Sequence, residues 1–73
     1  MKRIAIFPAI YPKLGQVGYS VGWLLDSNYC LVWGNYKTRE RANEIMKKEY
    51  PEHEIVNFKT DKECYHRYNS PNN

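Results

Sequence analysis

The sequence predicts a small α+β domain with the element order β-β-β-α-β, an antiparallel hairpin sheet, one helix packed on one face of that sheet and a flexible C-terminal tail. Three observations predict it: a length of 73 residues, strand-like alternation in the first half of the chain, and one capped amphipathic helix in the second half. A chain of this length buries only about 60% of the surface that its unfolded form exposes, so it holds one thin core. We expect a single domain over residues 1–58 and a flexible or disordered tail over residues 59–73.

The first expected strand is "KRIAIFPAIY", residues 2–11, in which apolar residues fall on both sides of a strand-like alternation. Pro8 cannot donate a hydrogen bond to a neighbouring strand, so the strand is an edge at Pro8 or ends near it. The segment "PKLGQVG", residues 12–18, then reads as a loop.

A hairpin is expected next, because "YSVGWLL" and "YCLVW" are rich in aromatic and branched side chains and are joined by the turn residues "DSN". With a three-residue loop, Leu25 pairs with Tyr29 and the side chains divide between two faces. One face would carry Tyr19, Val21, Trp23, Leu25, Tyr29, Leu31 and Trp33, and the opposite face Ser20, Gly22, Leu24, Cys30, Val32 and Gly34. The aromatic face is then either the core beneath the helix or an outward surface, with Gly22 and Gly34 admitting the helix on the other face.

The helix is expected over residues 39–50. Thr38 is a suitable N-cap, Glu40 lies in the first turn where the helix dipole favours a negative charge, and Pro51 ends the helix. The apolar stripe of the helix consists of Ala42, Ile45, Met46 and Tyr50. The segment "HEIVNF", residues 53–58, supplies a fourth short strand, and the rest of the chain shows no sustained pattern.

Composition favours a surface that binds another protein. The chain carries 11 Lys and Arg against 8 Asp and Glu, a mild excess that lacks the dense basic run of a nucleic-acid-binding arm. Aromatic residues make up 15% of the chain, more than one helix stripe can cover, and Trp and Tyr are common interface anchors. We therefore expect the second sheet face and a neighbouring strand edge to bind protein. The predicted partner-binding residues are Tyr19, Trp23, Trp33, Tyr36, Lys37, Arg39, Arg41 and Lys48.

No catalytic or metal-binding arrangement is predicted, and we expect no cofactor. The sequence has no Ser-His-Asp, Cys-His, paired-carboxylate or phosphate-loop spacing, and so short a chain has difficulty enclosing a catalytic cleft. Cys64 and His66 form a single Cys-x-His, which lacks the paired spacing of zinc ligands. We expect Cys30 and Cys64 to be free thiols in a cytoplasmic protein. The apolar run after "MKR" is too short for a signal peptide or a membrane span.

The resulting hypothesis is a small non-enzymatic module that inhibits or regulates a larger intracellular protein, in the manner of phage-encoded inhibitors. Self-association into a homodimer is another way to cover the same surface. The rival hypothesis is binding of single-stranded nucleic acid, with bases stacked on Tyr19, Trp23 and Trp33 beside the basic start of the helix. This rival ranks second because the net charge is only +3.

The sequence carries two local resemblances to known families. The segment "LVWGNYKTRERANEIMKKEY" is similar to the strand, Gly, aromatic, Thr and Ala-bearing helix arrangement of SPOR peptidoglycan-binding repeats. The segments "FPAIY" and "GYSV", with the step from strand to helix, resemble HicB-like antitoxins, which share the β-β-β-α-β order. In this chain "LLDSN" occupies the place of the Asp-Leu-Pro-Gly segment of that family. The second resemblance implies an antitoxin as an alternative function, and neither implies particular site residues.

Overall fold

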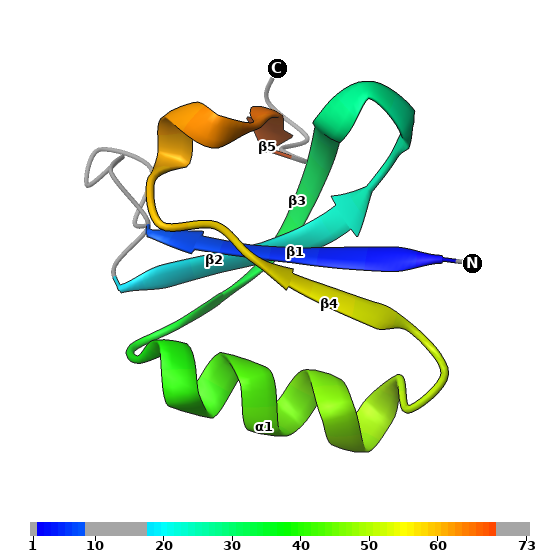
Figure 1. Ribbon diagram of the computed structural model, residues 1–73. Coiled ribbons are helices and arrows are strands. Elements are labelled where there is room, and N and C mark those ends of the chain that lie inside the picture. The colour runs from blue at the N-terminus through cyan, green and yellow to red at the C-terminus, as the bar shows by residue number, and fades with distance from the viewer. Residues whose placement is uncertain (1, 9–17, 69–73) are drawn as a thin grey trace.

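The computed structural model describes residues 2–8 and 18–68, which form a mixed sheet with one helix packed against it (Figure 1). The strands are β1 (Arg3–Pro8), β2 (Tyr19–Leu24), β3 (Tyr29–Tyr36), β4 (Glu54–Asn57) and β5 (Tyr65–Tyr68), the helix is α1 (Arg39–Glu49), and the short 3-10 turns are η2 (Asp26–Asn28) and η3 (Asp61–Glu63). The order across the sheet is β4-β1-β2-β3-β5. The first three strands are antiparallel neighbours, whereas β4 runs parallel to β1 and β5 runs parallel to β3. The predicted α+β fold, with one helix on one face of a sheet, is confirmed.

The hairpin between β2 and β3 has the three-residue turn that the sequence predicts. Leu25 donates its N–H to the carbonyl of Tyr29 at 2.7 Å, and Leu24 pairs with Cys30. Ser27 and Asn28 complete the turn with φ values of 60° and 57°, in the left-handed region where Asn is enriched. The turn therefore fixes the register at this end of the hairpin.

A β-bulge changes the alternation of β3 beyond the turn. Val21 pairs with Gly34 but Gly22 pairs with Val32, so Trp33 is the extra residue on β3. Gly34, predicted on the face opposite Val21, instead lies beside it, and a Cβ at Gly34 would meet Val21 Cγ2 at 2.7 Å. That prediction is wrong because it follows from an unbroken alternation, which the bulge interrupts.

The helix covers the aromatic face of the sheet. The Thr38 hydroxyl accepts a hydrogen bond from the Arg41 N–H at 3.1 Å, so the predicted N-cap is confirmed. Beneath the helix lies a cluster of buried side chains, Ile4, Ile6, Val21, Ala42 and Met46. Half-buried side chains surround it, namely Tyr19, Trp23, Trp33, Tyr36, Ile45, Tyr50 and Ile55. Of the two interpretations of the aromatic face, the core beneath the helix is therefore the correct one.

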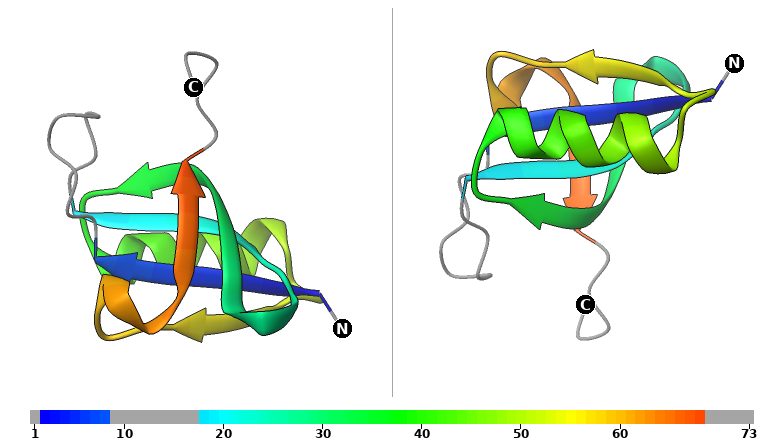
Figure 2. Two further views of the ribbon diagram at one scale, coloured as in Figure 1. Left: turned by 90° about the horizontal axis from the view of Figure 1, so that it is seen from above. Right: turned by 90° about the horizontal axis from the view of Figure 1, so that it is seen from below.

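The opposite face of the sheet is also covered, which corrects the expectation of an open second face. In Figure 2, β5 crosses over the sheet on the side away from the helix. The second buried cluster consists of Ala5, Phe7, Leu24, Cys30, Val32, Phe58 and Cys64. Gly22 permits this layer to form, because a Cβ there would lie 2.4 Å from the Leu31 carbonyl oxygen and 2.7 Å from Cys30 Sγ. Gly22 therefore admits the first half of β3, and not the helix as the sequence suggested.

Regular structure continues beyond the predicted end of the domain at residue 58. The turn η3 follows β4, and β5 then pairs with β3 from Tyr29↔Tyr65 to Val32↔Tyr68. Phe58 and Cys64 are 8% and 6% exposed, because both side chains pack into the second cluster. The domain boundary predicted at residue 58 therefore falls too early, and residues 69–73 of the predicted tail lie outside the described residues.

Arg39 links the start of the helix to the end of β4 by hydrogen bonds. Its guanidinium donates to Asn57 Oδ1 at 3.2 Å and to the Phe58 carbonyl at 2.8 Å. Asn43 and Asn57 exchange two amide hydrogen bonds of 2.8 and 2.9 Å. This network holds α1 against the edge strand β4 through polar contacts beside the apolar core.

Candidate functional site

The structure separates the predicted partner-binding residues between the two ends of α1. Tyr19 lies at the first turn of the helix, where the Arg39 guanidinium covers its ring at 4.8 Å from the centroid. Trp23 lies at the other end, where its ring contacts Tyr50, the residue that caps the helix. Tyr19 and Trp23 therefore do not form one continuous surface on which bases could stack.

Tyr36 pairs with Tyr19 across the hairpin. The pKa of its hydroxyl is influenced by charged residues of the helix. Burial raises the pKa of Tyr36, and the carboxylate of Glu49 adds to the rise while Arg41 opposes it. Tyr36 thus lies at the edge of the helix-side core and packs against it.

The charged side chains on the outer face of α1 alternate in sign. Arg41 forms an ion pair with Glu44, and a shallow depression of about 450 Å³ is lined by Arg41, Glu44, Ile45, Lys48 and Glu49. Lys37, at the start of the helix, is also exposed. Because carboxylates lie among the predicted basic residues, this face has no continuous positive field.

An aromatic cluster closes the other end of the helix. Trp23 lies at its centre, with its ring centroid 5.3 Å from Trp33, 5.2 Å from Tyr50 and 5.7 Å from His53. The Tyr50 and His53 rings are 5.3 Å apart in an edge-to-face arrangement. Pairs of this kind contribute about 0.5–1.5 kcal/mol beyond their buried area. The Trp33 Nε1 atom is buried without a hydrogen-bond partner among the described residues.

Two exposed leucines adjoin this cluster at the hairpin end of the sheet. Leu25 is 44% exposed and Leu31 is 38% exposed, and they are the exposed large hydrophobic residues of the described chain. Leu31 pairs with Trp23 across the strands, and Leu25 follows Trp23 by two residues, so all three lie on one face. We refer to Trp23, Leu25, Leu31 and Trp33 as the hairpin-end patch.

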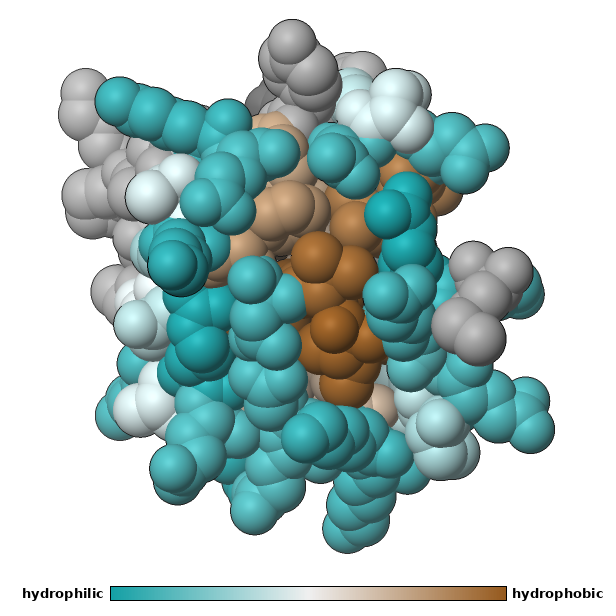
Figure 3. Space-filling model, in the orientation of Figure 1, coloured by the Kyte–Doolittle hydropathy of each residue, from teal (hydrophilic) through white to brown (hydrophobic). Residues whose placement is uncertain are grey.

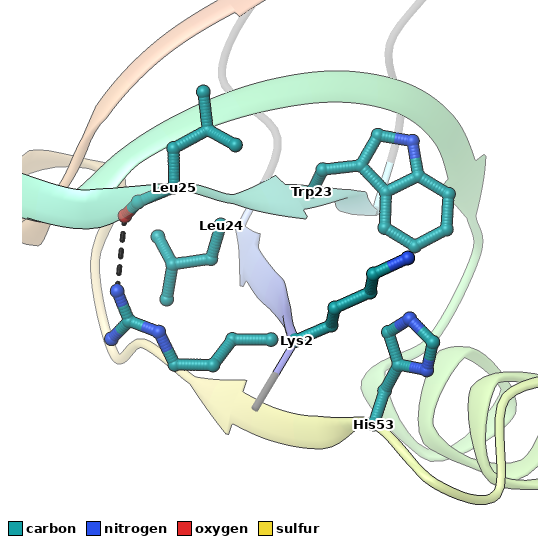
Figure 4. Close-up of a pocket in the computed structure, with 6 residues that line it drawn as sticks. Lys2, Trp23, Leu24, Leu25 and His53 are labelled. Atoms are coloured by element: carbon teal, nitrogen blue, oxygen red, sulfur yellow. Dashed lines mark hydrogen bonds between the residues drawn. The ribbon is translucent and has the colours of Figure 1, made fainter.

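A pocket of about 290 Å³ opens beside Trp23 (Figure 4). Its lining residues, which define the Trp23 pocket, are Lys2, Arg3, Trp23, Leu24, Leu25 and His53. In Figure 4 the side chain of Lys2 extends between Trp23 and His53. Arg3 donates to the Leu25 carbonyl at 3.0 Å. The pocket therefore combines apolar walls with cationic groups and has no carboxylate in its lining.

Strand pairing explains how distant residues meet in the Trp23 pocket. β1 and β4 are parallel, with Arg3 opposite Glu54, and Glu54 donates its N–H to the Lys2 carbonyl at 3.0 Å. This pairing brings His53, just before β4, beside Lys2, just before β1. Lys2, Arg3 and His53 were not predicted as site residues, because no local spacing signals a parallel pairing of distant segments. Leu25 and Leu31 were predicted on the aromatic face but not as partner-binding residues.

The edge strand β4 carries a second apolar area. It is a candidate for the strand edge at which the sequence predicts protein binding. Figure 3 shows apolar side chains gathered over β4 and between β4 and the helix. Ile55 and Val56 are half-buried there and pack against the two cores. The strand has only four residues, and short edge strands offer little backbone for pairing with another chain.

The two cysteines lie in the core and away from both surfaces. Burial, with a smaller contribution from Cys64, raises the pKa of the Cys30 thiol to about 12. No disulfide joins Cys30 and Cys64 in the structure. Within the described residues, no group of three or more His, Cys, Asp or Glu side chains is placed to hold a metal ion.

In the described part of the chain, α1 is too short and too polar to cross a membrane, and no other helix there meets the requirements of a span. No protein-family model, curated protein sequence or solved structure matches this chain.

Proposed function

We propose that this chain is a small non-enzymatic protein-binding module that inhibits or regulates a larger intracellular protein through the hairpin-end patch. The observation that carries the proposal is the exposure of Leu25 and Leu31 directly beside Trp23. Contiguous exposed apolar surface on small proteins commonly marks an interface, and Trp is enriched among the residues that dominate binding energy.

The proposed surface differs from the one that the sequence favoured. The second sheet face is filled by β5 and the residues before it, so it offers no surface to a partner. The helix α1 covers the aromatic face, but at the hairpin end Leu25 and Leu31 stay exposed beside Trp23. The helix is thus too short to cover the whole face, and the uncovered end is the binding surface in this proposal.

Substitutions of the exposed leucines test the proposal without removing core side chains. We expect Leu31→Ser and Leu25→Ser to abolish capture of the partner from a cell lysate, and Leu31→Met to retain it, because methionine keeps the apolar contact. Thermal unfolding of each variant checks that the fold is intact. If all variants capture the same proteins as the parent chain, the proposal is wrong.

Oligomeric state separates a foreign partner from a second copy. Light scattering of the purified chain gives its mass, and a dimer that Leu31→Ser converts to a monomer would assign the patch to self-association. A monomer that captures a partner through the leucines supports the inhibitor proposal. The antitoxin alternative is one case of such an inhibitor.

Binding of single-stranded nucleic acid is a second candidate, favoured by one observation. Lys2 and Arg3 lie in one pocket with Trp23, so a base and a phosphate could be held together there. Titration of Trp fluorescence with short oligonucleotides at low salt tests it. Nucleic-acid binding would weaken steeply as salt is added, because counterions compete for the phosphates.

A further inference from the structure

We infer that the Trp23 pocket binds an acidic peptide segment of the partner protein. One apolar side chain of that segment fills the pocket against Trp23 and Leu24, and a neighbouring carboxylate lies beside Lys2. This inference rests on the proposed function, since it gives the chemistry of the protein partner.

The apolar walls set the size of the group that enters. Trp23, Leu24 and Leu25 supply these walls, and the volume of about 290 Å³ is at the lower end of the range for ligand pockets. This suits one side chain of the size of Leu or Phe. Leu31 lies outside the pocket yet is 38% exposed, so a ligand that also covers Leu31 must extend past the pocket. A peptide segment does this, whereas a small molecule confined to the pocket does not.

The charges in the lining select an anion. Lys2 and Arg3 line the pocket, and the Lys2 ammonium makes no ion pair with any described residue. Arg3 donates to the Leu25 carbonyl and retains further N–H donors for a ligand. The acidic residues that are nearest in sequence to the lining residues are exposed and do not line the pocket; they are Asp26, Glu52 and Glu54. A carboxylate beside Lys2 would therefore meet positive charge without a competing acid in the wall.

The distribution of charge outside the pocket favours a peptide over a nucleic acid. A single strand of nucleic acid carries a phosphate at every nucleotide and binds along a continuous basic groove. On α1, Arg41 and Lys48 are interspersed with Glu44 and Glu49, so the cations of the pocket do not continue into such a groove. The local positive charge of Lys2 and Arg3 beside the apolar walls suits a peptide in which an acidic residue adjoins an apolar residue.

Matched peptides test this inference. The probes are capped ten-residue peptides with a central Leu or Phe flanked by two Glu on each side, and the controls carry Gln in place of each Glu. Binding is followed by the Trp fluorescence of the chain and by calorimetry. We expect the Glu peptides to bind at least about tenfold more tightly than the Gln peptides, because a carboxylate accepts charge-assisted hydrogen bonds from Lys2 and Arg3 that a neutral amide does not match. Equal affinity of the two sets, or no binding of either, would overturn the inference.

Variants of the pocket locate the interaction. Lys2→Gln should lower the affinity for the Glu peptides by about tenfold, whereas Lys2→Arg should retain most of that affinity. Lys47→Gln, an exposed lysine of α1, is the charge-matched control and should change nothing. If Lys47→Gln weakens binding as much as Lys2→Gln, only net charge matters and the pocket assignment is wrong. An oligonucleotide that displaces the peptide and binds more tightly would also overturn the inference.

The peptide assay and the lysate assay can reject the acidic-segment inference and the proposed function independently of each other. If Leu31→Ser abolishes partner capture while Lys2→Gln leaves both capture and peptide affinity unchanged, the protein-binding proposal holds and the acidic-segment inference is wrong. If the leucine variants retain capture, the proposed function itself is wrong whatever the peptides show.

Discussion

At the scale of single residues, Gly22 lies where the first half of β3 passes so close to β2 that a side chain has no room. An added Cβ would lie 2.4 Å from a backbone oxygen, which cannot move away as a flexible side chain can. We expect Gly22→Ala to lower the free energy of unfolding by about 1–3 kcal/mol. Gly34→Ala, whose Cβ would meet the Val21 side chain, is the control and should cost less. Urea unfolding measures both, and equal losses would contradict the close crossing at Gly22.

Cys30 gives a prediction on pH at the same scale. Its pKa is about 12 in the folded chain against 9.0 for an ordinary thiol, because burial disfavours the thiolate. The folded state therefore keeps its proton where the unfolded state loses it, so this stabilisation is complete below pH 9 and is lost between pH 9 and 12. The loss reaches about 1.4 kcal/mol for each pH unit in that window. Urea unfolding at about pH 8 and about pH 10.5 should show a smaller decrease for Cys30→Ala than for the parent chain, and an unchanged decrease would contradict the assignment.

At the scale of elements, the helix depends on its N-cap. Thr38 accepts from the Arg41 N–H at 3.1 Å, whereas Thr60, at the start of η3, makes no side-chain cap bond. We expect Thr38→Ala to lower the free energy of unfolding by about 1 kcal/mol and Thr60→Ala to have little effect. Chemical denaturation compares the two variants. Equal effects would show that the loss arises from something other than the cap.

At the scale of the whole molecule, the second core requires the segment that follows β4. A chain ending at Lys59 loses Cys64 and the pairing of β5 with β3, and it exposes part of the cluster around Phe7 and Val32. We expect this truncation to unfold at a clearly lower temperature than the full chain, because buried apolar surface contributes about 25 cal/mol per Å². A chain ending at Tyr68, which keeps every described residue, is the control. A truncation at Lys59 as stable as this control would restore the domain boundary predicted at residue 58.

Local signals in the sequence account for what could be predicted of this fold. The turn at Asp26–Asn28 and the cap at Thr38 each depend on a few consecutive residues, and both are confirmed. The bulge at Trp33, the pairing of β5 with β3 and the meeting of Lys2 with His53 depend on contacts between distant segments. Periodicity carries no information about such contacts. Trp23 and Trp33 are the residues of the proposed hairpin-end patch that the sequence also predicts to bind a partner, because Trp is a common interface anchor.

Cys30 lies on the strand that pairs with β5, Cys64 directly precedes β5, and both are buried in the second core, so access to these two side chains depends on β5. Short edge strands such as β5 often open in native conditions with a smaller free energy than global unfolding. Each opening of β5 would bring Cys30 and Cys64 into contact with solvent, where a thiol reagent can trap them. The ratio of their labelling rate to that of an unstructured cysteine then reports the equilibrium for detaching this strand, with the two native thiols as the reporters.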